Sequence, residues 1–194
     1  MEMTLQERTE IEEWLRPESK LEKEILSEPE FVRGLMWGKP RFGHPEGKVL
    51  YHVREVLDNI DRLPIDEPLR RDLRLVAYVH DSFKHLEDKS GYPRDWSKHH
   101  AVFARQFLQA YTDDCGLLDL VELHDEAYYS WRHLHLYEQE QKGNERLQSL
   151  LDRIGAHRQR YYLFFKCDTR TGDKNQAPLK WFEKTISSIE IVDF

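Results

Sequence analysis

The stretch EPLRRDLRLVAYVHDSFK, residues 67–84, carries apolar side chains at the spacing of an α-helix. Leu69, Leu73 and Val76 recur every three or four residues, and His80 continues the same face. Further apolar residues fill the remaining sides of this helix: Leu75, Tyr78, Val79 and Phe83. A helix that is apolar all round is typical of a buried position. We therefore expect residues 67–84 to form the central helix of the fold.

Helical patterns extend in both directions from this segment. A helix with Pro45 in its first turn carries apolar residues from Val49 to Ile60 and ends at Pro64. We also expect helices over residues 4–16, 18–27, 97–112, 117–134, 144–154 and 178–190, and loops over 85–96 and 169–178. No alternation of apolar and polar residues is long enough to predict a sheet. The pattern predicts an all-α helical bundle.

The composition of the chain changes at a segment rich in glycine and proline, from Gly34 to Gly47. We expect residues 1–43 to form an N-terminal helical extension that packs on the domain, and residues 44–194 to form the helical domain itself. The segment contains two basic residues, Lys39 and Arg41, together with aromatic side chains. A passive linker is not composed in this way, so we expect the segment to contribute to a site.

Length and charge exclude several classes of partner. At 194 residues the chain suits one domain with a sizeable core. Its formal net charge of −7 disfavours nonspecific binding to long nucleic acid, because an acidic surface repels the phosphate backbone. No apolar run approaches the roughly 18 residues of a membrane span, and the acidic start lacks the pattern of a signal peptide. We therefore expect a cytoplasmic protein that does not enter membranes.

Titratable residues stand on the apolar faces of two of these helices. His52 lies at the edge of one apolar stripe; His80 lies within the stripe of the central helix, next to Asp81 and one turn before Lys84. Burying an imidazole, a carboxylate and an ammonium together is costly unless they pair or bind a metal. Each residue alone also fits a structural role, such as a hydrogen-bonded core histidine, or an aspartate (Asp168) that caps a loop after an apolar run. Composition and periodicity leave both interpretations open.

Five stretches carry a resemblance to a known family: HPEGKVLYH (44–52), HDSFK (80–84), HHAVFA (99–104), VELHD (121–125) and FKCDTRTGD (165–173). Over roughly residues 44 to 175 they resemble the HD superfamily of metal-dependent phosphohydrolases, and most of all the HD domain of some bacterial tRNA nucleotidyltransferases. The resemblance implies a helical bundle whose divalent metal is bound by His52, His80, Asp81 and Asp168. It also implies that Lys84 contacts the substrate phosphate. Phe83 stands where the family often has a small residue, so we expect it to reshape the pocket.

Two imidazoles and two carboxylates around a divalent ion leave room for water. A divalent ion lowers the pKa of such a water and polarises a phosphoryl oxygen, and Asp81 is placed to orient the water. The mixed nitrogen and oxygen ligands favour Mn²⁺, Fe²⁺, Co²⁺, Ni²⁺ or Zn²⁺ over Mg²⁺, which prefers oxygen. We expect one ion. A second ion is the alternative, because His99, His100 and His124 match positions that bind one in some family members; otherwise these histidines contact phosphate or pair with carboxylates.

The resemblance predicts a phosphohydrolase that cleaves a phosphate mono- or diester of a nucleotide or a nucleic-acid end, with Lys84 and Asp81 as catalytic residues. Lys39, Arg41 and Arg132 are candidates for substrate binding, the alternative being ordinary solvated charges. Two other functions stay open. One is a diiron oxygenase, because a few HD-fold proteins hold two irons and activate dioxygen. The other is a nucleotide-sensing module that binds its ligand without hydrolysing it.

Overall fold

The computed structural model describes residues 5–42 and 45–194 of the chain. Within these ranges the regular elements are helices and no strand is present, which confirms the all-α prediction. The α-helices are α1 (Leu5–Leu15), α2 (Lys20–Ile25), α3 (Pro29–Leu35), α4 (Val49–Ile60), α5 (Glu67–Val79), α6 (His100–Leu108), α7 (Cys115–Leu123), α8 (Glu126–His135), α9 (Glu140–Ile154), α10 (Arg158–Thr169) and α11 (Ala177–Thr185). Short 3-10 turns are η1 (Lys84–Leu86), η2 (Trp96–Lys98) and η3 (Gly155–His157). None of the helices in the described part of the chain combines the length and the apolar character needed to cross a membrane.

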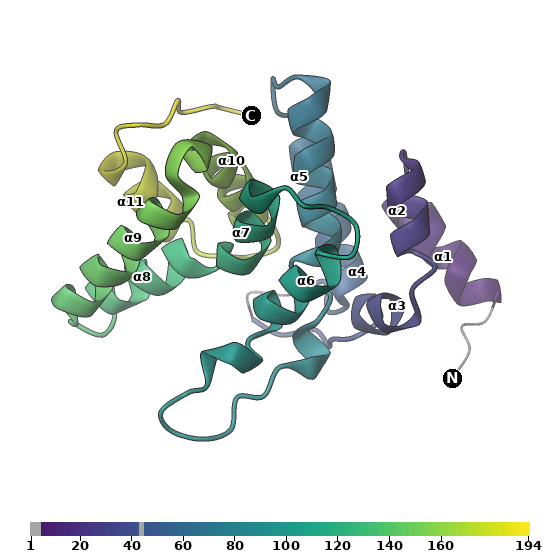
Figure 1. The fold of residues 1–194 in the computed structure, drawn as a ribbon, viewed down its shortest axis with the longest axis horizontal. Helices are drawn as coiled ribbons and strands as arrows, with labels where there is room; N and C mark the ends of the chain where they lie inside the picture. Colours follow the sequence, from purple (N-terminus) through teal and green to yellow (C-terminus); the bar gives the residue numbers. More distant parts are fainter. Residues whose placement is uncertain (1–4, 43–44) are drawn as a thin grey trace.

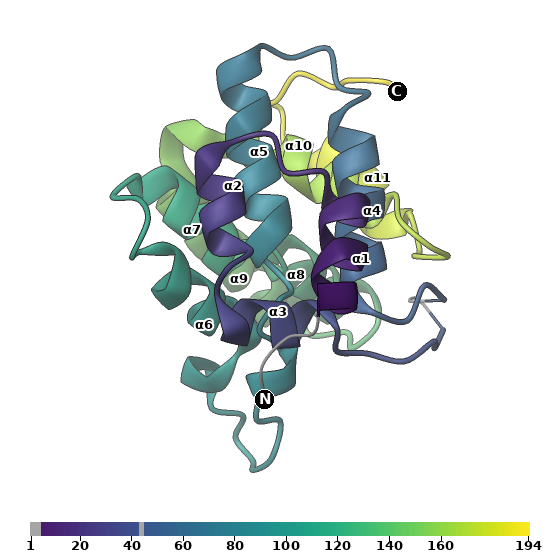
Figure 2. The same ribbon diagram turned by 90° about the vertical axis from the view of Figure 1, so that its right-hand side faces the viewer.

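Helix α5 lies at the centre of the bundle (Figure 1) and contacts α4, α7 and α10. Its residues 73–79 are all buried, as expected for a helix that is apolar on every side. The pairs α6–α7 and α8–α9 pack on one side of α5, and α11 packs against α8 and α10. The three N-terminal helices cover the other side, where α1 and α2 lie over α4 and α5 (Figure 2). The domain core is therefore enclosed between the N-terminal helices and the C-terminal half of the chain.

Buried polar side chains of α4 and α5 hold the end of α1 in place. Arg54 Nη1 donates to the Trp14 carbonyl oxygen at 3.2 Å, and the Tyr78 hydroxyl donates to the Leu15 carbonyl oxygen at 3.3 Å. Arg74, which is 1% exposed, donates from Nε to Glu22 Oε1 at 2.8 Å. The bonds from Arg54 and Tyr78 satisfy carbonyl groups that the end of α1 leaves unpaired, and the Arg74–Glu22 bond joins α5 to α2. The expected boundary between residues 43 and 44 lies outside the described residues.

Three expected helix limits are wrong. Helix α4 begins at Val49 and not at Pro45, because the Val49 N–H donates to the Trp37 carbonyl oxygen at 2.9 Å and Gly47 adopts a φ of +81°. Helix α5 ends at Val79, so residues 80–83 form a turn and not a last helical turn. The expected helix over 117–134 is divided by a turn at residues 124–125 into α7 and α8. Both unexpected turns contain a His-Asp pair.

The remaining expected helices agree in position and differ by a few residues at their ends, and the apolar run from Tyr161 to Phe165 lies in α10. Helix α3 was not expected from the sequence pattern. It is short, it begins with Pro29 at its first position, and it buries Phe31 and Leu35 against the core. Its seven residues are too few to show a helical period.

Gly34 brings α3 into direct contact with the turn that follows His80. A Cβ atom at Gly34 would lie 1.5 Å from the Ser82 carbonyl oxygen, so the two backbones touch. We expect Gly34→Ala to lower the free energy of unfolding by about 1–3 kcal/mol, because the extra methyl group forces backbone shifts. Denaturant unfolding measures this loss. The control is Arg33→Ala, an exposed position of the same helix, which should change stability by less than about 0.5 kcal/mol. Wild-type stability in Gly34→Ala would contradict this packing.

Candidate metal centre

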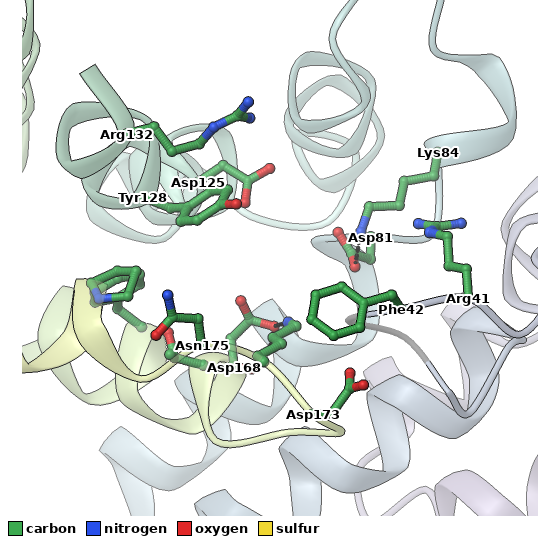
Figure 3. Close-up of a pocket in the computed structure, with 14 residues that line it drawn as sticks. Arg41, Phe42, Asp81, Lys84, Asp125, Tyr128, Arg132, Asp168, Asp173 and Asn175 are labelled. Carbon is green, nitrogen blue, oxygen red and sulfur yellow. Dashed lines mark hydrogen bonds and ion pairs between the residues drawn. The ribbon is translucent and has the colours of Figure 1, made fainter. Parts of the chain in front are cut away.

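A cavity of about 490 Å³ opens between α8, the loop before α4 and the loop after α10 (Figure 3). Three carboxylates, Asp81, Asp125 and Asp168, converge on it. Four basic side chains also line the cavity: Arg41, Lys84, Arg132 and Lys174. The rest of the lining includes aromatic and amide groups such as Phe42, Tyr128 and Asn175. The cavity therefore has a polar, charged floor and partly aromatic walls.

The two His-Asp pairs occupy equivalent positions at the ends of helices. His80 is the C-cap of α5 and His124 is the C-cap of α7. In each case Nδ1 lies close to a backbone carbonyl oxygen three residues earlier, that of Ala77 at 2.9 Å and that of Val121 at 2.8 Å. A carbonyl oxygen only accepts, so Nδ1 is the protonated nitrogen and Nε2 faces the centre. The partial negative charge of a helix C-terminus adds to the attraction for a cation at both places.

The first group of ligand atoms unites the four residues that the resemblance implies. They are His52 Nε2, His80 Nε2, Asp81 Oδ2 and Asp168 Oδ1. The two imidazole nitrogens are 3.2 Å apart, and the nitrogen-to-oxygen distances run from 2.9 Å (His52 to Asp168) to 3.6 Å (His80 to either carboxylate). Atoms that each bind one ion at about 2.1 Å are separated by roughly 3–3.5 Å. His52, His80 and Asp81 therefore lie close enough together to hold a metal ion, and Asp168 Oδ1 lies within 3.6 Å of both imidazole nitrogens of this group.

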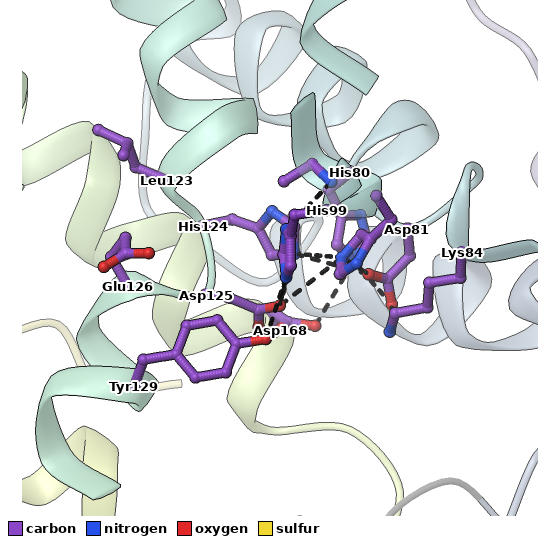
Figure 4. A network of polar contacts seen from close by, with 12 residues as sticks. His80, Asp81, Lys84, His99, Leu123, His124, Asp125, Glu126, Tyr129 and Asp168 are labelled. Carbon is purple, nitrogen blue, oxygen red and sulfur yellow. Dashed lines mark hydrogen bonds and ion pairs between the residues drawn. The ribbon is translucent and has the colours of Figure 1, made fainter. Parts of the chain in front are cut away.

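A second group of ligand atoms faces the other oxygen of Asp81 (Figure 4). His100 Nε2 lies 3.3 Å and His124 Nε2 lies 3.5 Å from Asp81 Oδ1, and the two nitrogens are 3.4 Å apart. Asp125 Oδ2 completes the group at 3.6 Å from each of these nitrogens. The Asp81 carboxylate thus stands between two groups of ligand atoms, with one oxygen toward each.

The outer nitrogens of the remaining two ligand histidines face carboxylates. His100 Nδ1 lies 3.3 Å from Glu87 Oε2, and His52 Nδ1 lies 3.8 Å from Glu46 Oε1. Burial alone would raise the pKa of Glu87, but His100 and nearby cations lower it to about 2, so this carboxylate is ionised. Such carboxylate or carbonyl partners orient metal-binding imidazoles and raise their basicity. His80, His100 and His124 therefore each have an outer hydrogen-bond partner suited to this role, and Glu46 faces the outer nitrogen of His52 at a longer distance.

His99 is next to His100 in the chain but is not one of the residues that face Asp81 Oδ1. Its Nδ1 accepts the Ala101 N–H at 3.3 Å, which leaves the proton of the neutral ring on Nε2. That nitrogen is 3.0 Å from the Tyr129 hydroxyl and 3.8 Å from Asp125 Oδ2. Glu87, His99 and His100 are close enough to form a further three-residue group, but in this arrangement Nε2 of His99 faces the Tyr129 hydroxyl and does not offer a lone pair. Of the neighbouring pair of histidines, His100 is the one that faces the centre.

The charge states of Asp81 and His52 suit cation binding, whereas that of His124 opposes it. Burial would raise the pKa of Asp81, but Lys84 and His80 hold it well below its usual range. Burial and the Lys174 ammonium lower the pKa of His52 to about 4, so this imidazole is neutral at pH 7. Burial would also lower the pKa of His124, but Asp125 and Asp81 raise it to about 9. A divalent ion bound by Nε2 of His124 would displace the proton from this nitrogen.

Two lysines contact the carboxylates from the cavity side. Lys84 Nζ contacts Asp81 Oδ2, and Lys174 Nζ lies 2.8 Å from Asp168 Oδ1. Burial would lower the pKa of Lys84, but Asp81 and Asp125 raise it above the ordinary value, so the side chain is an ammonium. An anionic group that approaches the two carboxylates through the cavity meets these cations first.

Comparison with models of protein families, with curated proteins and with solved structures finds no match. The interpretation of the site therefore depends on its own geometry and on the sequence motifs.

Two of the three basic residues that are candidates for substrate binding line the cavity, and the third does not. Arg41 and Arg132 line it, whereas Lys39 is exposed and is not part of its lining. The expectation that Phe83 reshapes the pocket is wrong: its side chain is 3% exposed and packs on Phe107, with ring centroids 5.0 Å apart, away from the cavity. The aromatic ring contributes to the core because the chain turns after His80.

Sequence reasoning did not identify Asp125, Glu87 or Lys174. Asp125 could have been predicted from the sequence, because the dipeptide His124-Asp125 repeats His80-Asp81. Glu87 could not have been predicted, because it lies in a segment with the composition of a loop and its side chain is buried only by tertiary contacts. Lys174 likewise lies in the loop after α10, and its contact with Asp168 depends on how that loop folds back.

Proposed function

We propose that this protein is a metal-dependent phosphohydrolase of the HD type that binds two divalent ions and hydrolyses a phosphate ester of a nucleotide or another small phosphorylated compound. The observation that carries the proposal is the Asp81 carboxylate between two groups of ligand atoms, with Lys84 beside it at the floor of a cavity. The sequence alone favours one ion. The second group, in which Asp125 joins His100 and His124, supports two.

Divalent ions held by these residues would neutralise phosphoryl oxygens and lower the pKa of a coordinated water. Lys84 supplies an ammonium that binds a phosphoryl oxygen and stabilises the charge that develops on it. Asp81 positions both groups of ligands and accepts a hydrogen bond from Lys84. The aromatic wall at Tyr128 and Phe42 provides a surface for the organic part of the substrate. The donor set of imidazoles and carboxylates fits Mn²⁺, Fe²⁺, Co²⁺, Ni²⁺ or Zn²⁺ better than Mg²⁺.

The test is a hydrolysis assay on the purified full chain. Protein treated with chelator and then supplied with Mn²⁺, Co²⁺, Ni²⁺, Zn²⁺ or Mg²⁺ is incubated with phosphomonoesters, phosphodiesters and a nucleotide panel. We expect phosphate or alcohol release that depends on a transition metal and stops when the chelator is restored. No release from any ester with any of these metals would overturn the proposal.

A diiron oxygenase is a second candidate, and the same observation favours it, because dioxygen chemistry at two irons also needs two neighbouring groups of ligands. Its distinguishing results would be close to two irons per chain in protein purified without added metal, and oxygen consumption in the presence of an organic co-substrate. Oxygen consumption without ester hydrolysis would replace the hydrolase proposal with this one.

A further inference from the structure

Two arginines line the cavity without an acidic partner. In the described part of the chain neither Arg41 nor Arg132 forms an ion pair with a carboxylate, whereas Lys84 and Lys174 contact the ligand carboxylates. Most arginines in this protein are paired, for example Arg70 with Glu18 at 2.6 Å. An unpaired guanidinium in the wall of a cavity is available for an anion.

Arg132 is also held in a fixed place. Its guanidinium carbon lies 5.5 Å from the ring centroid of Tyr128 and 5.0 Å from that of Tyr137, and Nη2 donates to the Tyr137 hydroxyl. Contacts with two aromatic faces orient the planar group, and only one of its five N–H donors is used in this bond. The side chain is therefore preorganised, with donors left for a ligand.

The position of Arg132 separates it from the phosphate-binding lysine. In Figure 3 Lys84 lies beside Asp81 on one side of the cavity, and Arg132 lies on the other side, near Asp125 and Tyr128. A single phosphate at the metal centre beside Lys84 would leave Arg132 without a partner. A ligand with two anionic ends would reach both.

The overall charge of the cavity leads to the same expectation. Its four basic side chains are balanced by four carboxylates: Asp81, Asp125, Asp168 and Asp173. Any divalent ion bound by these carboxylates leaves a net positive charge in the cavity, and two ions leave more. A ligand with several negative charges fits such a field better than one with a single phosphate.

We propose that the substrate carries a second anionic group, a phosphate or a carboxylate, and that Arg132 binds this group while the scissile phosphate occupies the metal centre. This inference depends on the proposed function, since that function places the first phosphate at the metals. Arg132 is then a specificity-determining residue that selects doubly anionic esters, and it takes no part in the chemical step.

Matched probes test the inference on metal-loaded protein. Glucose 6-phosphate has one anionic end; 6-phosphogluconate carries a carboxylate at C1 in place of the aldehyde, and glucose 1,6-bisphosphate carries a second phosphate at C1. Adenosine 5′-monophosphate and adenosine 3′,5′-bisphosphate repeat the comparison on a nucleotide scaffold. Affinity is measured as Kd by calorimetry or, for a probe that is turned over, as KM. We expect the protein to prefer the doubly anionic probes on at least one scaffold by about tenfold or more, and the two hexose probes show whether the second group is a carboxylate or a phosphate.

Two variants test whether Arg132 causes the preference for doubly anionic probes. Arg132→Gln should abolish the preference and leave the affinity for the singly anionic probe of that scaffold unchanged. Arg62→Gln, at an exposed position far from the cavity lining, is the matched control and should keep the preference. No preference on either scaffold, or an Arg132→Gln change that weakens all probes equally, would overturn the inference. If the protein binds the doubly anionic probes preferentially but releases no phosphate, only the hydrolase proposal is overturned. If it hydrolyses the probes without preferring the doubly anionic ones, only this inference is overturned.

Discussion

Replacing Asp81 with alanine is expected to remove both metal ions from the protein and to reduce phosphate release by on the order of a thousandfold or more. The reason is geometric: Oδ2 of Asp81 lies 3.5 Å from His52 Nε2, and Oδ1 lies 3.3 Å from His100 Nε2. No other carboxylate among the described residues has one oxygen at each group of ligand atoms. Elemental analysis of the purified variant and a turnover assay with the best ester measure the two effects.

The matched control is Asp173→Ala, which removes a carboxylate from the wall of the same cavity without touching either group of ligands. It should keep the metal content of the wild type. Circular dichroism of both variants establishes that the helices are retained. If Asp81→Ala, still folded, contained as much metal as Asp173→Ala, the assignment of Asp81 as a shared ligand would be wrong.

Replacing Lys84 with alanine is expected to have the second largest effect, a loss of on the order of a hundredfold in turnover with the metal content unchanged. The ammonium contacts Asp81 from the cavity side and offers no lone pair to an ion, so it can serve the phosphate but not the metal. Turnover under saturating metal, run beside elemental analysis, separates these two roles.

Lys98→Ala is the control for the Lys84 variant, because Lys98 is an exposed lysine whose partner, Asp88, lies outside the cavity. Its turnover should equal that of the wild type. Two results would contradict a role for Lys84 in phosphate binding. In the first, Lys84→Ala turns over as fast as Lys98→Ala; in the second, its slower turnover is explained by missing metal.

The helical fold could be predicted because helical spacing is a local property of the sequence. Residues 67–79 carry it without interruption, and the burial of Leu73 to Val79 agrees with it. The turns after Val79 and at His124 could not be predicted in this way. Neither contains glycine or proline, and both interrupt an apolar pattern that would allow the helix to continue. At each turn the histidine that ends the helix faces the centre of the site, a tertiary feature that no local pattern encodes.

The motifs identified four residues as expected metal ligands, and the structure brings these residues together: His52, His80, Asp81 and Asp168. The spacing of these residues along the chain says nothing about which oxygen of a carboxylate faces which neighbour. The placement of His100 and His124 beside Oδ1 of Asp81 therefore could not be predicted, because it depends on the packing of α6 against α7 and of α7 against α5. Long-range contacts of this kind also decide that Glu87, a loop residue by composition, is buried behind His100.

The central claim is a pair of metal ions that share Asp81, and the most direct measurement is the number of ions bound per chain. Chelator-treated protein is titrated with Mn²⁺ or Fe²⁺ by calorimetry under anaerobic conditions, and the dialysed product is analysed for metal. We predict two ions in the wild type and one in His124→Ala, since that change removes a ligand from the second group only. One ion in both proteins would contradict the claim and leave a mononuclear centre at His52, His80, Asp81 and Asp168.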